Sequence, residues 1–274
     1  MMYKIFLKTN VLAVVLFSVS FAGCTQKDSV SANDDSTHNI PGYTLVWSDG
    51  FDGSLIDPLK WSYEVNGNGG GNNELQYYTD FAENSFIENG SLVIQALKKN
   101  YKDKEYTSAR LRTLNKGDWK YGRFDIRAKL PYGRGLWPAI WMLPSDWEYG
   151  GWPMSGEIDI MEILGQEPYK LYGTIHYSSP SGDHEQSGGT YQLQSGTFAN
   201  DYHVFSVEWD SAGIQWFVDG IKYYTTLHGK PFDKRFHMIL NVAVGGNWPG
   251  SPDNTATFPQ KMYVDYIRVY QKIN

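Results

Sequence analysis

Three carboxylates stand close together in the segment Gly156 to Leu164, which reads GEIDIMEIL. Glu157, Asp159 and Glu162 are interleaved there with apolar and β-branched residues, a composition typical of a strand. Because burying an unpaired charge is costly, three acids in such a run are expected to face a polar cleft. The alternative, acids on a solvated edge strand, fits the apolar neighbours poorly. The pattern indicates chemistry by paired carboxylates, as in glycosidic bond cleavage.

A regular strand does not place all three acids on one face. Positions 157, 159 and 161 share a face, so Glu162 would point to the other side. One β-bulge between Asp159 and Glu162 restores the alternation and brings the three side chains together. Glu157 and Glu162 would then lie about four strand steps apart, or roughly 13 Å between Cα atoms at ~3.3 Å per residue. If each side chain leans inward by roughly 4 Å, the carboxyl groups approach to about 5 Å.

That separation distinguishes two ways of cutting a glycosidic bond. A retaining enzyme needs ~5–5.5 Å between its carboxyls, whereas an inverting one needs ~6.5–9.5 Å to admit a water molecule. The spacing therefore favours retention through a covalent intermediate. Asp159, between the two glutamates, is placed to hydrogen-bond the nucleophile and to tune both pKa values. The spacing does not decide which glutamate attacks.

The elements that must carry these acids are short strands. From Tyr43 onwards, β-rich runs alternate with Gly, Pro, Asn and Asp, and clear examples are Ser91–Leu97, Gly122–Leu130, Tyr202–Trp209, Met238–Val244 and Met262–Tyr270. Two further runs, Gln215–Val218 and Ile221–Thr225, flank Asp219-Gly220, a two-residue hairpin signal. No long segment has helical periodicity, and there is no internal repeat. The pattern predicts a two-sheet sandwich or jelly roll, without giving the order of the strands.

The composition limits the kind of partner. Aromatic residues make up 16% of the 274 residues, with 10 Trp and 20 Tyr, which suits either a β-sandwich core or flat surfaces that stack on sugar rings. A formal charge of −6 without a basic cluster argues against nucleic acid as a partner. The six histidines show no zinc-type spacing, so no catalytic metal or other cofactor is predicted.

The N-terminal segment is predicted to direct export. Residues 1–23 have the form of a signal peptide, with an apolar run from Val11 to Phe17. Cys24, the single cysteine, follows Ala-Gly as in a bacterial lipobox, although Phe21 replaces the usual Leu. We expect Cys24 to be lipidated; the alternative is ordinary cleavage after Ala22. Residues 24–40 are predicted to be a flexible polar tether, and 41–274 the folded domain. The expected destination is the bacterial cell envelope or surface, with the membrane as partner through the lipid anchor.

The segment GEIDIMEIL resembles the signature of glycoside hydrolase family 16 in its bulged, laminarinase-like form, with E-x-D-x-x-E spacing. The resemblance runs from about Tyr43 to Gln271 and includes NNELQYYT (72–79), SARLRT (108–113), GLWPAIWMLP (135–144), GTIHY (173–177), VAVGGNWPG (242–250) and YVDYIRVYQ (263–271). It implies an all-β, concanavalin-like jelly roll of two curved antiparallel sheets with a concave substrate cleft. It also implies that Glu157 is the nucleophile, Asp159 its helper, and Glu162 the general acid and then base.

Four tryptophans are candidates for contact with sugar rings. Trp137 and Trp141, near the acid strand in GLWPAIWML, are expected to form a stacking platform and pocket wall, or else to pack in the core. Trp152, just before the acid strand, and Trp248, in the glycine-rich GGNWPG loop, are expected at an exposed cleft edge, because a displayed Trp needs a purpose.

Polar candidates come from the other motifs. The resemblance implies that Asn73 and Glu74 hydrogen-bond sugar hydroxyls; Gly70 stands where the family often has Trp. Arg112 is expected to contact sugar or orient an acid, or to be a surface charge. His176 is expected to bond a carboxylate near the site, or to be a core histidine. Asn241 is expected to support the cleft from a neighbouring strand.

The resemblance also implies one structural calcium on the convex face, far from the acids. The matching positions are Gly50, Gly90 and Asp265, which would bind it mainly through backbone oxygens.

The expected activity is endo-acting, retaining hydrolysis of β-1,3-glucan or mixed β-1,3/1,4-glucan by a single chain acting as a monomer. One alternative is a non-catalytic glucan-binding lipoprotein of the same fold. Another is a related substrate such as agarose, carrageenan or xyloglucan, which the acid spacing and the NNELQYYT motif disfavour.

Overall fold

The computed structural model describes residues 39–273. The predicted signal peptide, Cys24 and nearly all of the predicted tether lie outside this range. Within it, no helix has the length and apolar character needed to cross a membrane. The first strand, β1 (Tyr43–Asp49), begins at Tyr43.

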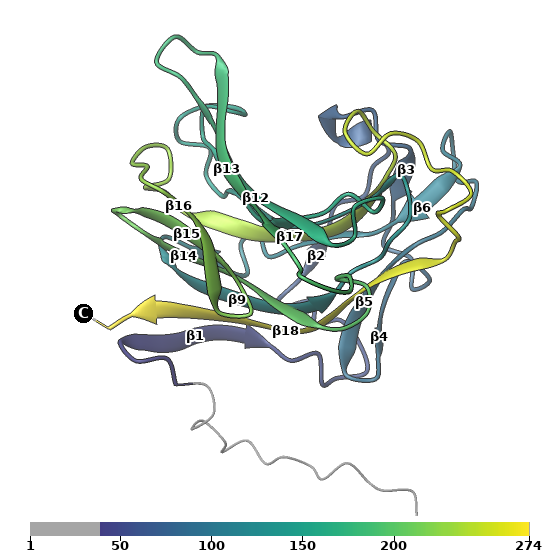
Figure 1. Cartoon of the computed structure of the whole chain (residues 1–274), viewed down its shortest axis with the longest axis horizontal. Coiled ribbons are helices and arrows are strands. Elements are labelled where there is room, and N and C mark those ends of the chain that lie inside the picture. Colours follow the sequence, from purple (N-terminus) through teal and green to yellow (C-terminus); the bar gives the residue numbers. More distant parts are fainter. Residues whose placement is uncertain (1–38, 274) are drawn as a thin grey trace, which may run out of the picture. The chain divides into compact units, whose positions relative to one another are not determined.

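Two large antiparallel sheets make up the folded part (Figure 1). The first sheet has the order β13 (His184–Gln192), β12 (Lys170–Ser178), β11 (Glu157–Glu162), β10 (Leu136–Pro144), β17 (Phe236–Val244), β7 (Arg110–Arg112) and β2 (Ser62–Tyr63), and β8 (Asp118–Trp119) also pairs with β17. It is the concave sheet, and the acid strand β11 lies in its interior.

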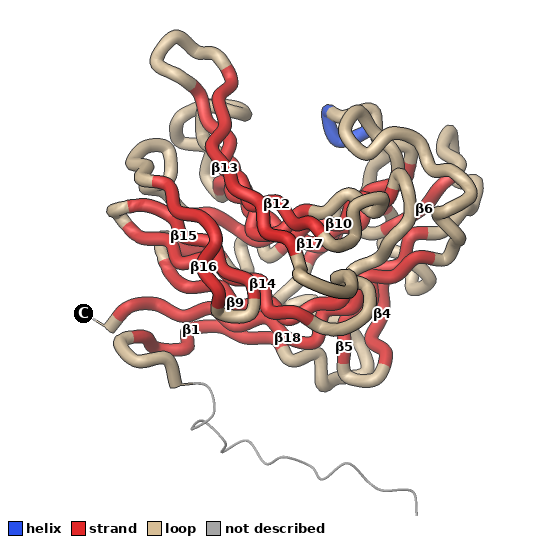
Figure 2. Tube along the Cα trace, viewed as in Figure 1, coloured by secondary structure: helices blue, strands red, loops and turns tan. Residues whose placement is uncertain are grey.

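The second sheet packs behind the first. Its order is β16 (Ile221–Thr226), β15 (Gly213–Val218), β14 (His203–Asp210), β9 (Gly122–Lys129), β18 (Gln260–Lys272), β5 (Ser91–Ala96) and β4 (Ser85–Glu88), and β1 pairs with β18. Residues 39–273 also contain a short parallel pair, β3 (Gln76–Tyr78) and β6 (Tyr106–Ser108), and one 3-10 turn, η2 (Gly69–Gly71) (Figure 2). The predicted all-β jelly roll is confirmed.

The core lies between the sheets and follows from the two-residue period of the strands. On β9, Phe124, Ile126 and Ala128 are fully buried, while Arg123 and Arg127 on the other face are partly exposed. All nine residues of β17 are buried, because this interior strand lies between the core and the cleft. The burial of these alternating apolar residues fixes the register of each strand.

The hairpin predicted at Asp219-Gly220 is confirmed. It joins β15 to β16, and both turn residues have positive φ, 49° at Asp219 and 78° at Gly220. Positive φ at both positions is what a type I′ turn requires, and it matches the right-handed twist of the flanking strands.

A second hairpin, β12–β13, was not predicted as a pair of strands. It rises at one side of the concavity, opposite the region of η2, β3 and β6 (Figures 1 and 2). Most residues of β13 are exposed and polar, so the strand lacks the apolar alternation that sequence reasoning relies on. Its position makes it a wall of the cleft.

Candidate active site

The predicted bulge in the acid strand is confirmed. Glu157 pairs with His176 and Glu162 with Tyr172, so five steps along β11 face four along β12. The register on β10 slips at the same place, where Trp141 faces Asp159 and Ile140 faces Met161. The bulge puts Glu157, Asp159 and Glu162 on the cleft face, since all three line the cleft.

The second sheet holds the bulge in place. A bulge interrupts the ladder and leaves backbone groups to be satisfied by other partners. The Asp159 carbonyl accepts a hydrogen bond of 2.8 Å from the indole Nε1 of Trp216 on β15. Gly173 leaves room for that indole, because a Cβ at this position would lie 2.5 Å from Trp216 Cδ1. The spacing of the acids therefore depends on a side chain from the opposite sheet.

Each glutamate accepts a hydrogen bond from a tryptophan. Trp152 Nε1 donates to Glu157 Oε2 at 2.8 Å, and Trp137 Nε1 donates to Glu162 Oε1 at 2.9 Å. Among residues 39–273, no Lys or Arg forms an ion pair with either glutamate or with Asp159, and His176 Nε2 lies 3.2 Å from Asp159 Oδ2. The acids are thus oriented by neutral donors without being neutralised by a cation.

Burial and mutual repulsion raise the pKa of all three acids. The pKa of Glu157 rises to about 8, mainly through burial and then through the charge of Asp159. The pKa of Glu162 rises to about 7, again through burial first and the charge of Glu157 second. Burial, reinforced by Glu162, raises the pKa of Asp159 well above its usual range. At neutral pH the three acids are therefore not all ionised, and the cleft keeps a carboxyl that can act as a general acid.

A cleft of about 820 Å³ runs over the three acids. Seven of the nine predicted sugar-contact residues line it: Glu74, Trp137, Trp141, Trp152, His176, Asn241 and Trp248. Trp152 and Trp248 are 49% and 40% exposed, so the predicted exposed cleft edge is confirmed. Trp137 and Trp141 are partly exposed in the cleft and are not core residues.

Asn73 and Arg112 do not line the cleft. Asn73 Nδ2 donates to Asn247 Oδ1 at 2.9 Å, so it ties its loop to the Trp248 loop. Arg110, on the same face of β7 as Arg112, lines the cleft instead. The reason is register, because Arg110 pairs with Asn241 beside the cleft whereas Arg112 pairs with Ile239, further from it.

Arg110 is a functional candidate that sequence reasoning missed. Its guanidinium lies 3.7 Å from Glu74 and 5.3 Å from the centre of the Trp141 ring. Trp141 in turn donates to Asn241 at 2.8 Å. The motif SARLRT contains both arginines, and alternation alone could not choose between them. Tyr172, Trp147 and His184 also line the cleft and lie outside the predicted set.

Gly70 has a local explanation. Its φ is +57°, and a Cβ there would lie 2.3 Å from the Glu74 carboxylate. A side chain at this position would have to displace Glu74, which is 3% exposed and accepts hydrogen bonds from Gln76 and Tyr78. Glycine therefore allows the buried Glu74 carboxylate to take this position.

The predicted calcium positions are brought near one another by the strand register. Asp49, beside Gly50, pairs with Ile267, and Leu92, close to Gly90, pairs with Val264. However, the Asp265 carboxylate lies 2.6 Å from the Arg127 guanidinium. With that ion pair in place, the Asp265 side chain does not fit a calcium ion. No step of the chemistry depends on calcium. Calcium binding stays a prediction, which melting curves with Ca²⁺ and with a chelator would test.

The sequence and the structure are both similar to those of known proteins. The family model described as "Glycosyl hydrolases family 16" matches residues 73–268. A β-glucanase of Rhodothermus marinus is 44% identical over 287 aligned residues, covering 98% of this chain and 96% of the relative. The laminarinase catalytic domain of Thermotoga maritima is 47% identical, with a TM-score of 0.78 over 85% of this chain and 99% of that one. A non-specific endo-β-1,3(4)-glucanase with 1,3-β-D-cellobiosyl-glucose at its active site is 40% identical, with a TM-score of 0.78 over 85% of this chain and 96% of that one.

Proposed function

The chain belongs to glycoside hydrolase family 16, and we propose that it is an endo-acting β-glucanase that cleaves 1,3-linked and mixed 1,3/1,4-linked glucan with retention. The observation that carries this proposal is the bulge of β11. It places Glu157 and Glu162 on the floor of the cleft, opposite residues of β12 that are four positions apart. The relatives described above, a β-glucanase and a laminarinase among them, support the same activity.

The two glutamates divide the reaction between them. The Glu157 carboxylate attacks the anomeric carbon, while the Glu162 carboxyl gives its proton to the leaving glycosidic oxygen. A glycosyl ester on Glu157 results. Glu162, now ionised, removes a proton from water, and that water displaces Glu157 and releases a product of unchanged configuration. The Trp152 N–H fixes one oxygen of Glu157, which leaves the other for attack.

Asp159 controls the protonation of this pair. Its carboxyl and that of Glu157 have oxygens within 4.8 Å of each other, and burial raises the pKa of both, so Glu157 holds a proton at rest. Passing that proton to Asp159 leaves Glu157 ionised and able to attack. Because burial and Glu162 already favour the neutral form of Asp159, this transfer needs no external base.

Aromatic residues lie on both sides of the acids and are proposed to bind the glucan. Trp248 lies 5.4 Å from Trp137 and 4.9 Å from Tyr172, between ring centres, and these three form one group beside Glu162. Trp152 and His184, 4.7 Å apart, form another beside Glu157. A chain held on both sides of the cut site suits endo-acting cleavage. Arg110, Glu74 and Asn241 supply polar contacts along the floor.

The test of retention is the configuration of fresh product. Proton NMR of a laminarin digest should show the β-anomer first, with the α signal growing later by mutarotation. Appearance of the α-anomer first would mean that a water fits between the carboxyls, and the nucleophile assignment would then be wrong. Release of reducing ends from laminarin, barley β-glucan and lichenan separates the enzyme from a glucan-binding protein, and the product ratios give the linkage preference.

The N-terminus is proposed to anchor the enzyme to a membrane. Cys24 follows a lipobox-like sequence after an apolar run, so lipidation at this residue would tether the domain at the cell envelope. Wild-type protein should partition into detergent, and Cys24→Ala should move it to the aqueous phase. Free wild-type protein beginning at Gly23 would contradict the anchor.

A further inference from the structure

At one end of the acid strand β11, a histidine lies beside two carboxylates. Glu157, Asp159 and His176 each offer a ligand atom, and these atoms lie within 4.8 Å of one another. We propose that this cluster is a binding site for a late first-row divalent cation, of which Zn²⁺ is the probe, and that the bound ion excludes glucan. The exclusion of glucan by the ion rests on the proposed function of Glu157, whereas the binding of the ion does not.

The position of Asp159 is the first argument. Asp159 is 2% exposed, and among residues 39–273 its Oδ2 has no hydrogen-bond partner. This oxygen lies 3.2 Å from His176 Nε2, but the two atoms are not in hydrogen-bond geometry. A buried acceptor without a donor calls for an explanation. A cation between the oxygen and the ring nitrogen would use both lone pairs.

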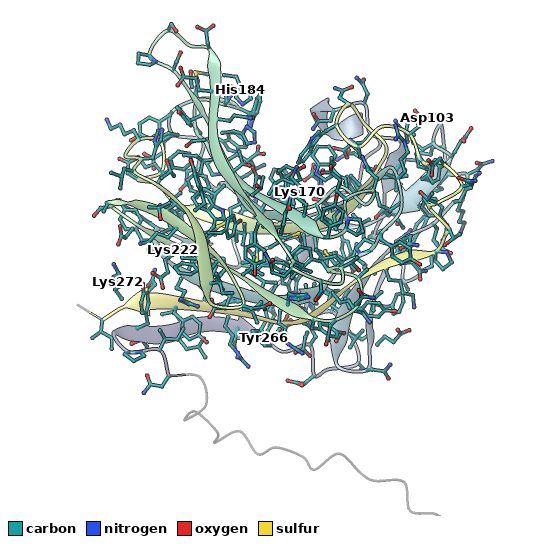
Figure 3. All side chains as sticks on the ribbon, viewed as in Figure 1. Asp103, Lys170, His184, Lys222, Tyr266 and Lys272 are labelled. Atoms are coloured by element: carbon teal, nitrogen blue, oxygen red, sulfur yellow. The ribbon has the colours of Figure 1, made fainter. Side chains whose placement is uncertain are left out.

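The surroundings of His176 are the second argument. Its Nδ1 lies 2.9 Å from Nε2 of His184, a residue of β13 that is labelled in Figure 3. With Nδ1–H donating to His184, the Nε2 of His176 carries a lone pair toward Asp159. Metal-binding histidines almost always have such an outer partner, which fixes the tautomer and the ring orientation.

Glu157 is also oriented from outside. Trp152 holds Oε2 at 2.8 Å, which leaves Oε1 as a ligand, and the Trp152 ring packs 4.7 Å from that of His184. Two carboxylates and one imidazole with an open position suit zinc and its neighbours better than calcium or magnesium, which prefer oxygen ligands alone. No Lys or Arg forms an ion pair with the cluster in the part of the chain described, so no resident cation competes with a divalent ion for these ligands. An ion on Glu157 would prevent attack on the anomeric carbon.

The experiment is a calorimetric titration of ZnCl₂ into chelator-treated protein, with and without a saturating laminari-oligosaccharide. We expect one cleft-bound ion, displaced by the sugar, and competitive inhibition in which KM rises and kcat does not change. His176→Gln should abolish this binding. His184→Phe keeps a ring beside Trp152 but removes the acceptor, and it should weaken Zn²⁺ by roughly 10- to 100-fold. His184 is at the surface, so this variant tests the site even if His176→Gln does not fold.

The matched control is His203→Gln. His203 also pairs with a carboxylate, at 2.7 Å from Asp219, but on the second sheet and outside the three-residue cluster. It should bind Zn²⁺ as the wild type does. The proposal is overturned if the His176 and His184 variants keep wild-type affinity, or if the oligosaccharide leaves the titration unchanged. Because the titration needs no turnover, an inactive protein with this binding pattern would refute the proposed function alone.

Discussion

The acids of two bulged strands in this molecule have different kinds of partner. In β11, the bulge brings Glu157, Asp159 and Glu162 together. The two glutamates accept hydrogen bonds from indoles, and none of the three acids has an arginine or lysine ion pair within residues 39–273. In β18, the register against β9 shifts between Val264 and Tyr266, and the extra residue, Asp265, pairs with Arg127 at 2.6 Å. The same backbone irregularity therefore serves chemistry in one sheet and a surface ion pair in the other. What differs is the partner of the carboxylate. In β11, where no cation pairs with them, burial and mutual repulsion raise the pKa values of the three acids.

The largest effect should come from the nucleophile. Glu157→Gln removes the attacking group, so we expect kcat to fall by on the order of 10⁴-fold or more on every glucan while the substrate still binds. Reducing-end assays and glucan-binding measurements check this. Turnover within about tenfold of wild type would mean that the unpaired acids of β11 are not reactive in the way proposed.

Glu162→Gln should separate the two roles. Loss of the general acid should reduce kcat by roughly 10²–10⁴-fold on glucan. The loss should be much smaller on an aryl glycoside with a good leaving group, which departs without a proton. Glu157→Gln is the comparison, because it should fail on both substrates; equal losses for the two variants on the aryl substrate would contradict the assignment.

The stability of the two bulged strands should depend on pH differently. The folded-state pKa of Glu162 rises from 4.5 to about 7, so between these values the folded protein binds more protons than the unfolded chain. Its contribution to stability is therefore lost as the pH rises through that window. Glu162→Gln should be more stable than wild type by about 1–3 kcal/mol at pH 8, with almost no difference at pH 4. Urea unfolding at both pH values checks this; a variant less stable at pH 8 would contradict it.

Trp216→Phe tests whether the bulge needs its partner from the second sheet. The substitution removes the donor to the Asp159 carbonyl and leaves it buried without that bond, which should cost about 1–3 kcal/mol of unfolding free energy. Because the bulge sets the acid spacing, kcat should fall at temperatures where the variant is fully folded. Stability loss with an unchanged kcat would show that β11 keeps its bulge unaided.

The smallest effect should come from the bulge in β18. Asp265 and Arg127 are about one-third exposed, so Asp265→Asn should cost only about 0.2–1 kcal/mol of stability and leave kcat unchanged. Unfolding curves and laminarin assays under the same conditions check both statements. A clear loss of activity would mean that the two bulges are coupled.

The sequence was most informative where one residue pattern had a single physical solution. Three acids in an apolar strand required a bulge, and Asp219-Gly220 required a tight hairpin; both are present. It was least informative where the pairing register of two strands decides which side chain reaches the cleft. SARLRT offered two arginines on one face, and only the pairing of β7 with β17 brings Arg110 to the cleft. His184 was missed because β13 is an exposed polar strand whose position comes from β12 and not from its own pattern.

The contact between Trp216 and the Asp159 carbonyl links residues far apart in the chain and in different sheets. Contacts of this kind form late in folding, because the loops between them must be closed before they contribute. We expect the concave sheet to be able to assemble its ladder before the acids reach their working spacing. Catalysis would then be among the last properties to return on refolding. Tryptophan fluorescence and laminarin hydrolysis, followed in the same refolding experiment, should recover in that order.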